Sequence, residues 1–481
     1  MDLGSSGAAA PLARTKIVAT IGPACESLGQ IVELAMAGVS VFRLNMAHAS
    51  IEEHAAHRDA VHAAGQRIGR PLAVLVDLAG PKIRLGELPG DLLELLADQE
   101  ISFVRGEPAS PSELTTTYPT LVDELSVGDR VMLADGTVGL KVVAKLPDSA
   151  RCRVVQPGAV RSRQGVNLPG VRLRTPALTP DDLAHAAWAA EVEADFLGLS
   201  FVRSAADVQK LKEFLSERQS LTKVIAKIEK PEALAELESI VDAADGVMIA
   251  RGDLGVEIDV AEVPVVQKRI IALCRQMQKP VITATQMLDS MEDAPRPTRA
   301  EASDVANAIL DGSDACMLSG ETAIGRYPRA AVETMSRIAR VTEELYAHSP
   351  PGPATTRRAA GVLPVTHAVV VGASAMAREL SARLIVVASH SGATALALSK
   401  QRNFVPTVGV SDRPQTLRQM CLYWGVRPLA APIDATGALL RHLETWGKTS
   451  SVLASGDRIV LVSGTRMAGA GHNLVLVHEV S

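Results

Sequence analysis

Short apolar runs alternate with helical patterns from Arg14 onward, and this alternation constrains the fold more than any other feature of the sequence. It is the sequence form of repeated β-α units and a parallel sheet. Eight runs are apolar enough for strands buried on both faces: residues 16–22, 39–45, 71–77, 195–202, 223–229, 246–253, 280–286 and 315–321. Eight strand-helix pairs predict an α/β protein built on a (β/α)8 TIM barrel, whose reactive groups gather at the carboxyl ends of its strands.

The segments between these runs have helical patterns. Ser50 and Glu53 have the spacing of a capping box at the start of a helix within residues 50–69. Pro231 suits the first position of a helix over residues 231–244.

The third and fourth runs are separated by a long interval, because the next convincing barrel element after Arg84 begins near Thr179. Residues 87–163 carry short Val-rich runs broken by VGDR, ADGT and QPG turns, which predicts an inserted small β-barrel-like lid domain over the barrel mouth. The barrel itself would comprise residues 14–86 and 164–349. A Pro-rich polar linker, SPPGPATTRR, follows.

The last part of the chain, residues 358–481, has a second α/β pattern. Its apolar runs are residues 383–389, 407–412, 457–464 and 473–480, with helical segments between them. These predict a C-terminal open-sheet α/β domain.

Composition narrows the kinds of partner. The 481 residues carry a formal net charge of -5 with Lys and Arg scattered among Asp and Glu, so we expect no nucleic-acid partner. The five cysteines are far apart and form no C-x-x-C pair, which favours neither disulfides nor zinc and suits a reducing cytoplasm. We expect a soluble, unprocessed chain, because it has no apolar stretch of membrane-spanning length and no leader pattern at its start.

Polar side chains end several of the barrel runs that are otherwise apolar. One of them alone could be a solvated strand end, but together they would ring one barrel mouth. They are Arg43, Asn45, Asp77, Lys227, Glu229, Arg251, Asp253, Thr285, Ser319 and Glu321.

Two carboxylates in this ring are suited to a hard divalent cation. Glu229 and Asp253 end adjacent predicted strands, and Mg2+ is commonly held by one or two carboxylates plus substrate oxygens and water. Lys227 lies two residues before Glu229, so both side chains point to one face, where a cation stabilises developing negative charge. The alternative for Lys227 is a salt bridge to Glu229 without a catalytic part.

Three further features suit an anionic substrate. The stretch RGDLGVE, residues 251–257, has two glycines that allow close approach of an anion, at a possible helix start. The planar fork of Arg43 suits a phosphoryl oxygen, or else a buried ion pair with Asp77 or Glu321. Thr285 would donate its hydroxyl near a reacting carbon, or bond to neighbouring backbone.

Several long strings of this sequence together resemble the pyruvate kinase family from residue 14 to about residue 349. The C-terminal resemblance is weaker. The strings are TKIVATIGPA, RLNMAHA, DLAGPKIRLG, GVNLPG, AKIEKPEAL, GVMIARGDLGVE, PVITATQML, PTRAEASDVANAILDG and MLSGETAIGRYP.

This resemblance implies phosphoryl transfer from phosphoenolpyruvate to ADP, through an enolate that is protonated to pyruvate, with Mg2+ or Mn2+ as cofactor. That reaction is the last step of glycolysis. By motif position, the resemblance implies these roles: Glu229 and Asp253 as metal ligands; Lys227, Arg43 and Thr285 as catalytic residues; Arg43, Lys227, Gly252, Asp253 and Thr285 as substrate contacts; and Asn45, His48 and Arg84 near the nucleotide phosphates.

Two substitutions depart from the family pattern for K+ binding. Ala47 stands where many members have a serine ligand, and Lys82 where they have a glutamate. An ammonium group offers donors and charge but no acceptor, so we expect Lys82 to take the place of K+ and to face Asn45 and Asp77, beside Leu78. The enzyme would then need no K+. The alternative is that Lys82 is a solvated loop charge. A third departure, Gln164 in place of a common lysine, weakens any nucleotide contact there.

The stretch HSGATALALSK, from His390, resembles the family's site for a phosphorylated effector, and SGTRMAGAGHN resembles its second wall. A strand-to-helix turn can hold a phosphate through amides and hydroxyls, or be an ordinary capped helix. The residues would be Ser389, Ser391, Gly392, Ala393 and Thr394. The resemblance also implies an allosteric homotetramer in the cytoplasm, with residues 358–481 as its regulatory domain.

Two other classes compete with this interpretation. A barrel lyase acting on 2-oxo acids could hold Mg2+ in the same way, although the inserted β domain and the C-terminal unit argue against it. A non-catalytic effector-binding relative would have little reason to hold Lys227, Glu229 and Asp253 together.

Overall fold

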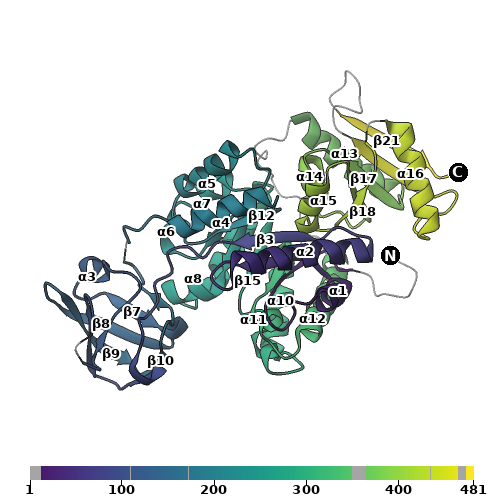
Figure 1. The fold of residues 1–481 in the computed structure, drawn as a ribbon. Helices are drawn as coiled ribbons and strands as arrows, with labels where there is room; N and C mark the ends of the chain where they lie inside the picture. The colour runs from purple at the N-terminus through teal and green to yellow at the C-terminus, as the bar shows by residue number, and fades with distance from the viewer. Residues whose placement is uncertain (1–11, 109, 172, 349–363, 434, 464–472) are drawn as a thin grey trace.

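A computed structural model describes residues 12–108, 110–171, 173–348, 364–433, 435–463 and 473–481 (Figure 1). Its centre is a closed barrel of strands in the order β1-β16-β15-β14-β13-β12-β3-β2, all paired in parallel. The strands are β1 (Lys16–Thr20), β2 (Val39–Asn45), β3 (Ala73–Asp77), β12 (Phe196–Leu199), β13 (Lys223–Ile228), β14 (Gly246–Ala250), β15 (Val281–Ala284) and β16 (Ala315–Leu318). The predicted (β/α)8 barrel is confirmed.

Helices surround this barrel and bury its outer face, where the strands are apolar on both sides. They are α1 (Leu28–Ala37), α2 (Ile51–Ile68), α4 (Pro180–Glu191), α5 (Ala205–Glu217), α6 (Pro231–Ala235), α7 (Leu237–Ala243), α8 (Arg251–Glu257), α9 (Val263–Gln276), α10 (Arg299–Asp311), α11 (Gly320–Ala323) and α12 (Pro328–His348). The capping box of Ser50 and Glu53 starts α2 as predicted. The predicted single helix over residues 231–244 is divided at Glu236 into α6 and α7.

Seven of the eight barrel strands are shorter than the apolar runs that predicted them, and the last three bear on the site. β14 ends at Ala250, β15 at Ala284 and β16 at Leu318. The chain turns into helix α8 or α11 directly after two of them, so Arg251 and Asp253 lie in the first turn of α8 and Glu321 lies in α11. Apolar runs cannot locate this change, because the buried turn residues continue the pattern.

The insert forms a β domain at one side of the barrel (Figure 1). A six-stranded sheet has the order β11-β7-β8-β9-β5-β6, and β10 pairs with β4. Its elements are β4 (Leu92–Leu95), β5 (Glu100–Val104), β6 (Glu113–Leu114), α3 (Leu121–Glu124), β7 (Arg130–Leu133), β8 (Val138–Lys145), β9 (Ser149–Gln156), β10 (Gly158–Arg161) and β11 (Val166–Asn167). The domain boundaries stay predictions; β11, within residues assigned to the barrel, pairs with β7 of the insert.

The C-terminal domain is an open sheet of order β19-β18-β17-β20-β21, in which β21 runs antiparallel to β20. Its elements are α13 (Pro364–Glu379), β17 (Leu384–Ala388), α14 (Ala393–Ser399), β18 (Thr407–Ser411), α15 (Pro414–Gln419), β19 (Val426–Ala430), α16 (Thr436–Thr449), β20 (Arg458–Ser463) and β21 (Leu474–Glu479). The prediction omitted β19, an edge strand whose sequence VRPLA carries a proline and an arginine in place of an apolar run.

This domain covers the amino ends of the barrel strands. Arg418 Nε lies 2.8 Å from Asp195 Oδ1, just before β12, and Lys16 Nζ donates to the Val426 carbonyl over 2.7 Å. Lys400 and Arg402 pair with Asp314, just before β16. The carboxyl ends of the strands therefore lie away from the C-terminal domain.

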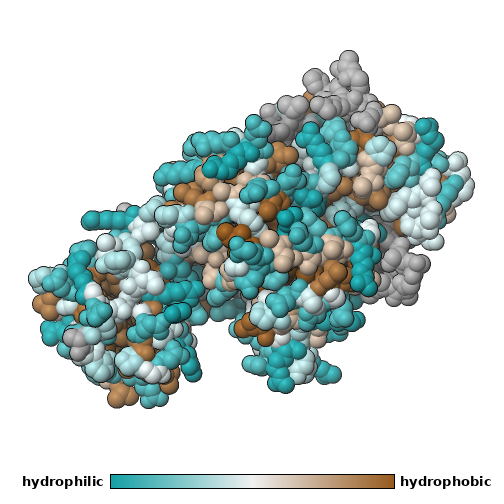
Figure 2. All heavy atoms as spheres, in the orientation of Figure 1, coloured by the Kyte–Doolittle hydropathy of each residue, from teal (hydrophilic) through white to brown (hydrophobic). Residues whose placement is uncertain are grey.

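The surface in Figure 2 is largely hydrophilic, with hydrophobic residues in separate patches over the barrel. Among the described residues, no helix has both the length and the apolar character needed to cross a membrane. All five cysteines are buried and free.

Candidate active site

Lys227 is the buried centre of a charge cluster at the carboxyl ends of β13 and β3. Its Nζ lies 2.9 Å from Glu229 Oε1 and 3.3 Å from Asp77 Oδ1, and it donates to Ser200 Oγ over 2.7 Å. Burial lowers the pKa of Lys227, but the carboxylates of Asp77 and Glu229 outweigh it and leave that pKa above its ordinary value. Lys227 is therefore a fixed cation. The salt bridge between Lys227 and Glu229, expected if the lysine had no catalytic part, is present.

Arg43, on β2, brings a second cation to the same carboxylate. Its Nε lies 2.6 Å from Asp77 Oδ2, and its Nη1 donates to Thr20 Oγ1 over 3.2 Å. Burial raises the pKa of Asp77, but Lys227 and Arg43 together hold the net pKa below its usual range. The alternative ion pair between Arg43 and Asp77 is thus found. It orients the guanidinium at the mouth without excluding a substrate contact.

Glu229 and Asp253 are close enough for their charges to interact. Burial raises the pKa of Glu229, Lys227 opposes that shift, and the negative charge of Asp253 raises it further. Glu229 also accepts a hydrogen bond from the Phe201 amide over 2.9 Å. A divalent cation between these carboxylates would relieve their repulsion, so the donor set fits a hard metal such as Mg2+.

Lys82 lies against Asp253, with its Nζ 3.2 Å from Asp253 Oδ1. The predicted contact of Lys82 with Asp77 and Asn45 is therefore corrected. Asp77 already holds two cations, Arg43 and Lys227, which would repel a third. Asn45 Oδ1 instead accepts from the Ala47 amide over 3.3 Å. The Lys82 side chain is 30% exposed, so it is only partly solvated.

Leu78, the fourth residue predicted near a monovalent cation, is buried at the end of β3. Its carbonyl accepts from Ser200 Oγ over 2.7 Å, and its amide donates to the Gly198 carbonyl. Both backbone groups of Leu78 are thus engaged, by Gly198 within β12 and by Ser200 directly after it.

Thr285 and Gly252 meet where β15 and α8 come together. The Gly252 amide donates to Thr285 Oγ1 over 2.7 Å, and that hydroxyl donates to the Ala284 carbonyl over 2.6 Å. Thr285 has a φ of 66°, in the left-handed region that β-branched residues rarely adopt. Such strain persists only where the surroundings fix it, as they do at functional sites.

Arg251 and Glu321 hold the loops around the mouth. Arg251 donates to the carbonyls of Thr285 and Gln286 and pairs with Asp304 Oδ2 over 2.6 Å. Glu321 accepts from the amides of Leu288 and Ser319. These hydrogen bonds give both residues a structural part.

The residues predicted near the nucleotide lie toward the insert. Arg84 Nη1 donates to the Arg163 carbonyl over 3.1 Å; Arg84 is half-buried and His48 is exposed. Desolvation, followed by the charges of Arg84, Arg43 and Lys82, holds the pKa of His48 below its ordinary value. These side chains therefore share a positive field that suits phosphates.

Ser200 and Phe201 are site residues that sequence reasoning missed. Ser200 joins Lys227 to the Leu78 carbonyl, and the Phe201 amide holds Glu229. The rule that selected the other residues would have found Ser200, since it ends the apolar run DFLGLS. Phe201 acts through its backbone, which leaves no side-chain signal.

The predicted effector residues form one turn between β17 and α14. Ser389 Oγ accepts from the Gly392 amide over 3.0 Å, and Ser391 Oγ accepts from the Ala393 amide over 3.4 Å. Gly392 has a φ of 79°, and Thr394 lies buried in the first turn of α14. The predicted second wall, SGTRMAGAGHN, falls mainly on residues 464–472, outside the described residues.

A (β/α)8 barrel with lysine, arginine and carboxylates at the carboxyl ends of its strands is typical of barrel enzymes that act on anionic substrates. The comparisons with known proteins identify the family. Residues 12–332 match the family model for the pyruvate kinase barrel domain, and residues 367–478 match that for the pyruvate kinase alpha/beta domain. The chain belongs to the pyruvate kinase family and is a phosphotransferase.

Individual relatives agree with this assignment. The chain is 40% identical to a pyruvate kinase of Geobacillus stearothermophilus over 97% of its own length and 80% of the relative's. It is also 40% identical to a pyruvate kinase of Mycobacterium intracellulare over 97% and 98% of the two chains. A solved pyruvate kinase from Cryptosporidium parvum superposes with a TM-score of 0.88 at 32% identity, covering 99% of this chain and 100% of that one.

Proposed function

We propose that this chain transfers the phosphoryl group of phosphoenolpyruvate to ADP, with Mg2+ and without K+, and so catalyses the last step of glycolysis. The observation that carries this proposal is the cluster in which Lys227 lies within 3.3 Å of both Asp77 and Glu229, beside Arg43 and Asp253. A buried cation next to a divalent site is the arrangement that a developing enolate and a transferring phosphoryl group require.

Glu229 and Asp253 would hold Mg2+, or Mn2+, with the remaining ligands from substrate and water. When bound, the metal would neutralise negative charge on the transferring group. Phosphoryl transfer asks mainly for in-line positioning and charge neutralisation, so no covalent nucleophile on the protein is needed.

The chain's own side chains would bind and orient phosphoenolpyruvate. Arg43 would bind a phosphoryl oxygen, held in place by its bond to Asp77. Lys227 would stabilise the enolate oxygen, since its charge is fixed by two carboxylates. The Gly252 amide and the Thr285 hydroxyl, 2.7 Å apart, would exchange their mutual hydrogen bond for substrate. Asn45, His48 and Arg84 would lie near the nucleotide phosphates.

We further propose that Lys82 supplies the charge that K+ supplies in many relatives. Its ammonium lies beside Asp253, so it acts on the metal-binding edge of the site, away from Asp77. At about 4 Å and an effective dielectric near 20, a unit charge contributes roughly 4 kcal/mol, an upper value for partly exposed groups.

The test of this function is pyruvate release from phosphoenolpyruvate and ADP, with tetramethylammonium as the only monovalent cation. We expect full turnover with Mg2+, dependence on ADP, and little change on adding K+. Pyruvate formation without ADP would indicate hydrolysis of phosphoenolpyruvate, with water accepting the phosphoryl group, and no pyruvate formation at all would leave the barrel lyase as the alternative. A many-fold stimulation by K+ would refute the role of Lys82 and leave the reaction itself intact.

Four wider features of the family are proposals for this chain. The turn of Ser389, Ser391, Gly392, Ala393 and Thr394 would hold a phosphorylated effector through its amides and hydroxyls. We also propose a homotetramer, a cytoplasmic location and an insert that closes as a lid. Enzyme titration with sugar phosphates, and the mass of the assembly in solution, test the first two.

A further inference from the structure

A buried ion pair outside the cluster of Lys227 joins the segments that carry the two proposed metal ligands. Lys230 Nζ lies 2.6 Å from Glu257 Oε1, and the two side chains are 11% and 1% exposed. Lys230 directly follows Glu229. Glu257 lies four residues after Asp253, on the same face of helix α8.

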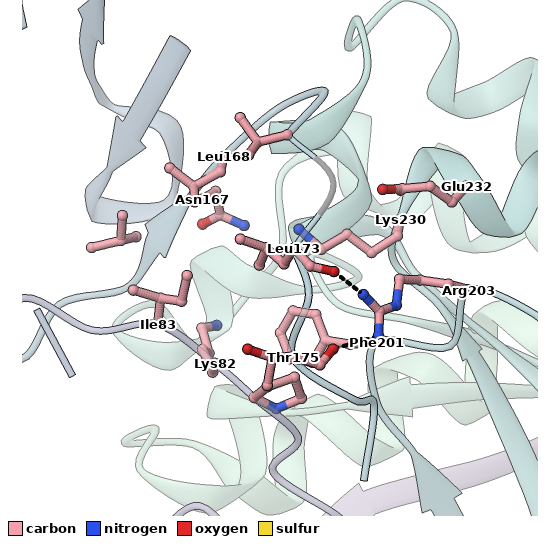
Figure 3. Close-up of a pocket in the computed structure, with 13 residues that line it drawn as sticks. Lys82, Ile83, Asn167, Leu168, Leu173, Thr175, Phe201, Arg203, Lys230 and Glu232 are labelled. Atoms are coloured by element: carbon pink, nitrogen blue, oxygen red, sulfur yellow. Dashed lines mark hydrogen bonds between the residues drawn. The ribbon is translucent and has the colours of Figure 1, made fainter. Parts of the chain in front are cut away.

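The same carboxylate is tied to the insert. Asn167, the last residue of β11, donates its Nδ2 hydrogen to Glu257 Oε1 over 3.4 Å, and it is only 4% exposed. β11 pairs with β7 of the insert. Figure 3 shows Asn167 and Lys230 pointing toward one another from the insert and barrel sides of a small pocket.

Helix α8 also packs directly on the insert. A Cβ atom at Gly136 would lie 3.2 Å from Val256 Cγ2, closer than most real contacts, so the two segments are in tight contact. α8 lies at the junction of barrel and insert in Figure 1. The helix that bears Asp253 therefore has two independent contacts with the insert.

We propose that Lys230, Glu257 and Asn167 are positioning residues that set the spacing of Glu229 and Asp253 and couple it to the position of the insert. This inference rests on the proposed function, since it takes these carboxylates to be the metal ligands. One shared oxygen, Glu257 Oε1, links both ligand segments to β11. Outer partners of this kind commonly change metal affinity about 10- to 100-fold.

Positioning and simple charge effects predict different results. Glu257→Gln leaves the Lys230 cation unpaired near the site and would weaken metal binding electrostatically. Lys230→Met leaves the Glu257 carboxylate unpaired near the site and would strengthen metal binding electrostatically. If the pair acts by positioning, both single variants, the charge-neutral double variant Lys230→Met/Glu257→Gln and Asn167→Ala all weaken it. The double variant also avoids the cost of one unpaired buried charge.

The experiment is a titration of substrate-free full-length protein with Mn2+, followed by electron paramagnetic resonance of the free ion. We expect the Kd to rise about ten-fold in the double variant and to rise in Asn167→Ala. Melting temperature is measured on each variant. Lys400→Met, which breaks a buried pair at the far end of the barrel, should lower the melting temperature without changing the Kd.

Wild-type Kd values in a folded double variant, or opposite shifts in the two single variants, would overturn this proposal. So would an equal loss of Mn2+ affinity in Lys400→Met, or no Mn2+ binding by the wild type. The titration needs no substrate. Failure of wild-type protein to transfer a phosphoryl group to ADP while Mn2+ binding follows the expected pattern would instead refute the proposed function alone.

Discussion

Individual residues at the barrel mouth divide the charge unequally. Asp77 is held by two cations, Arg43 and Lys227, and is therefore an internal counter-ion rather than a free ligand. Glu229 and Asp253 each face one cation, Lys227 and Lys82 respectively, and are the carboxylates that we propose as metal ligands. The polar strand ends could predict that these side chains meet at the barrel mouth, but not which of them pair, because pairing depends on distances across the barrel.

The first prediction concerns Lys227. Lys227→Met should lower kcat by about two to three orders of magnitude, because one preorganised charge facing the enolate is lost. Steady-state turnover of phosphoenolpyruvate with ADP measures it. Lys223→Met, at the opposite end of the same strand β13, is the control and should keep near-normal turnover. A Lys227→Met enzyme within ten-fold of wild type would remove Lys227 from the mechanism.

The second prediction concerns Lys82. Lys82→Met should lower turnover in tetramethylammonium buffer, and K+ should restore part of it, because the variant lacks the cation beside Asp253. Lys82→Arg keeps the charge and should stay insensitive to K+. The measurement is kcat with and without K+ for all three proteins. A Lys82→Met enzyme as active as wild type in tetramethylammonium would contradict the internal-cation role.

At the scale of elements, the order and type of the barrel strands could be predicted from the sequence, because buried strands and amphipathic helices alternate with different periods. The ends of the strands could not be predicted. The apolar run 246–253 predicts one strand, but the chain turns after Ala250 and the buried Arg251 already belongs to the first turn of α8. The prediction that Lys82 faces Asn45 and Asp77, when it pairs with Asp253, was wrong for a related reason. A loop residue's reach depends on backbone turns such as that at Gly80, which has a φ of 65°.

The third prediction concerns the segment that returns from the insert to the barrel. Arg203 donates to the carbonyls of Leu173 over 2.6 Å and Thr175 over 2.5 Å, as Figure 3 shows. Arg203→Ala should speed amide hydrogen exchange in residues 173–178, because these carbonyls lose their donors while β13 keeps its ladder. Arg218→Ala, an exposed arginine at the end of α5, is the control. Unchanged exchange in that segment would show that Arg203 does not hold it.

At the scale of the whole molecule, the two extra domains contact opposite ends of the barrel. The C-terminal domain binds the amino ends of the strands through Asp195 and Asp314, while the insert lies beside the carboxyl ends, next to α8. The sequence predicted both extra domains from changes in pattern. It could not predict these junctions, because ion pairs such as Arg418 with Asp195 join residues more than two hundred positions apart.

The fourth prediction concerns the cleft of about 800 Å³ between α2 and the C-terminal domain. Burial, with the charges of Arg418 and Arg58, lowers the pKa of His62 to about 4. Below pH 6.5 the unfolded chain binds a proton at His62 that the folded chain does not bind until about pH 4. The contribution of His62 to the free energy of unfolding is therefore constant above pH 6.5 and decreases as the pH falls from 6.5 to about 4.

His62→Gln should remove part of this loss, on the order of 1 kcal/mol at pH 5 after allowing for partial exposure. Urea unfolding midpoints of wild type and variant at pH 7.5 and pH 5 measure it. His442→Gln, at the rim of the same cleft, is the control for loss of a histidine. Equal losses of stability in wild type and His62→Gln would contradict the lowered pKa.

The most direct test of the central claim is 31P nuclear magnetic resonance of wild-type protein with phosphoenolpyruvate and ADP, with Mg2+ and with an excess of chelator, in tetramethylammonium buffer. We predict loss of the phosphoenolpyruvate signal with equal growth of the three ATP signals when Mg2+ is present, and neither change under chelation. Growth of inorganic phosphate without ATP, or ATP formation that persists under chelation, would contradict phosphoryl transfer at a metal site of Glu229 and Asp253.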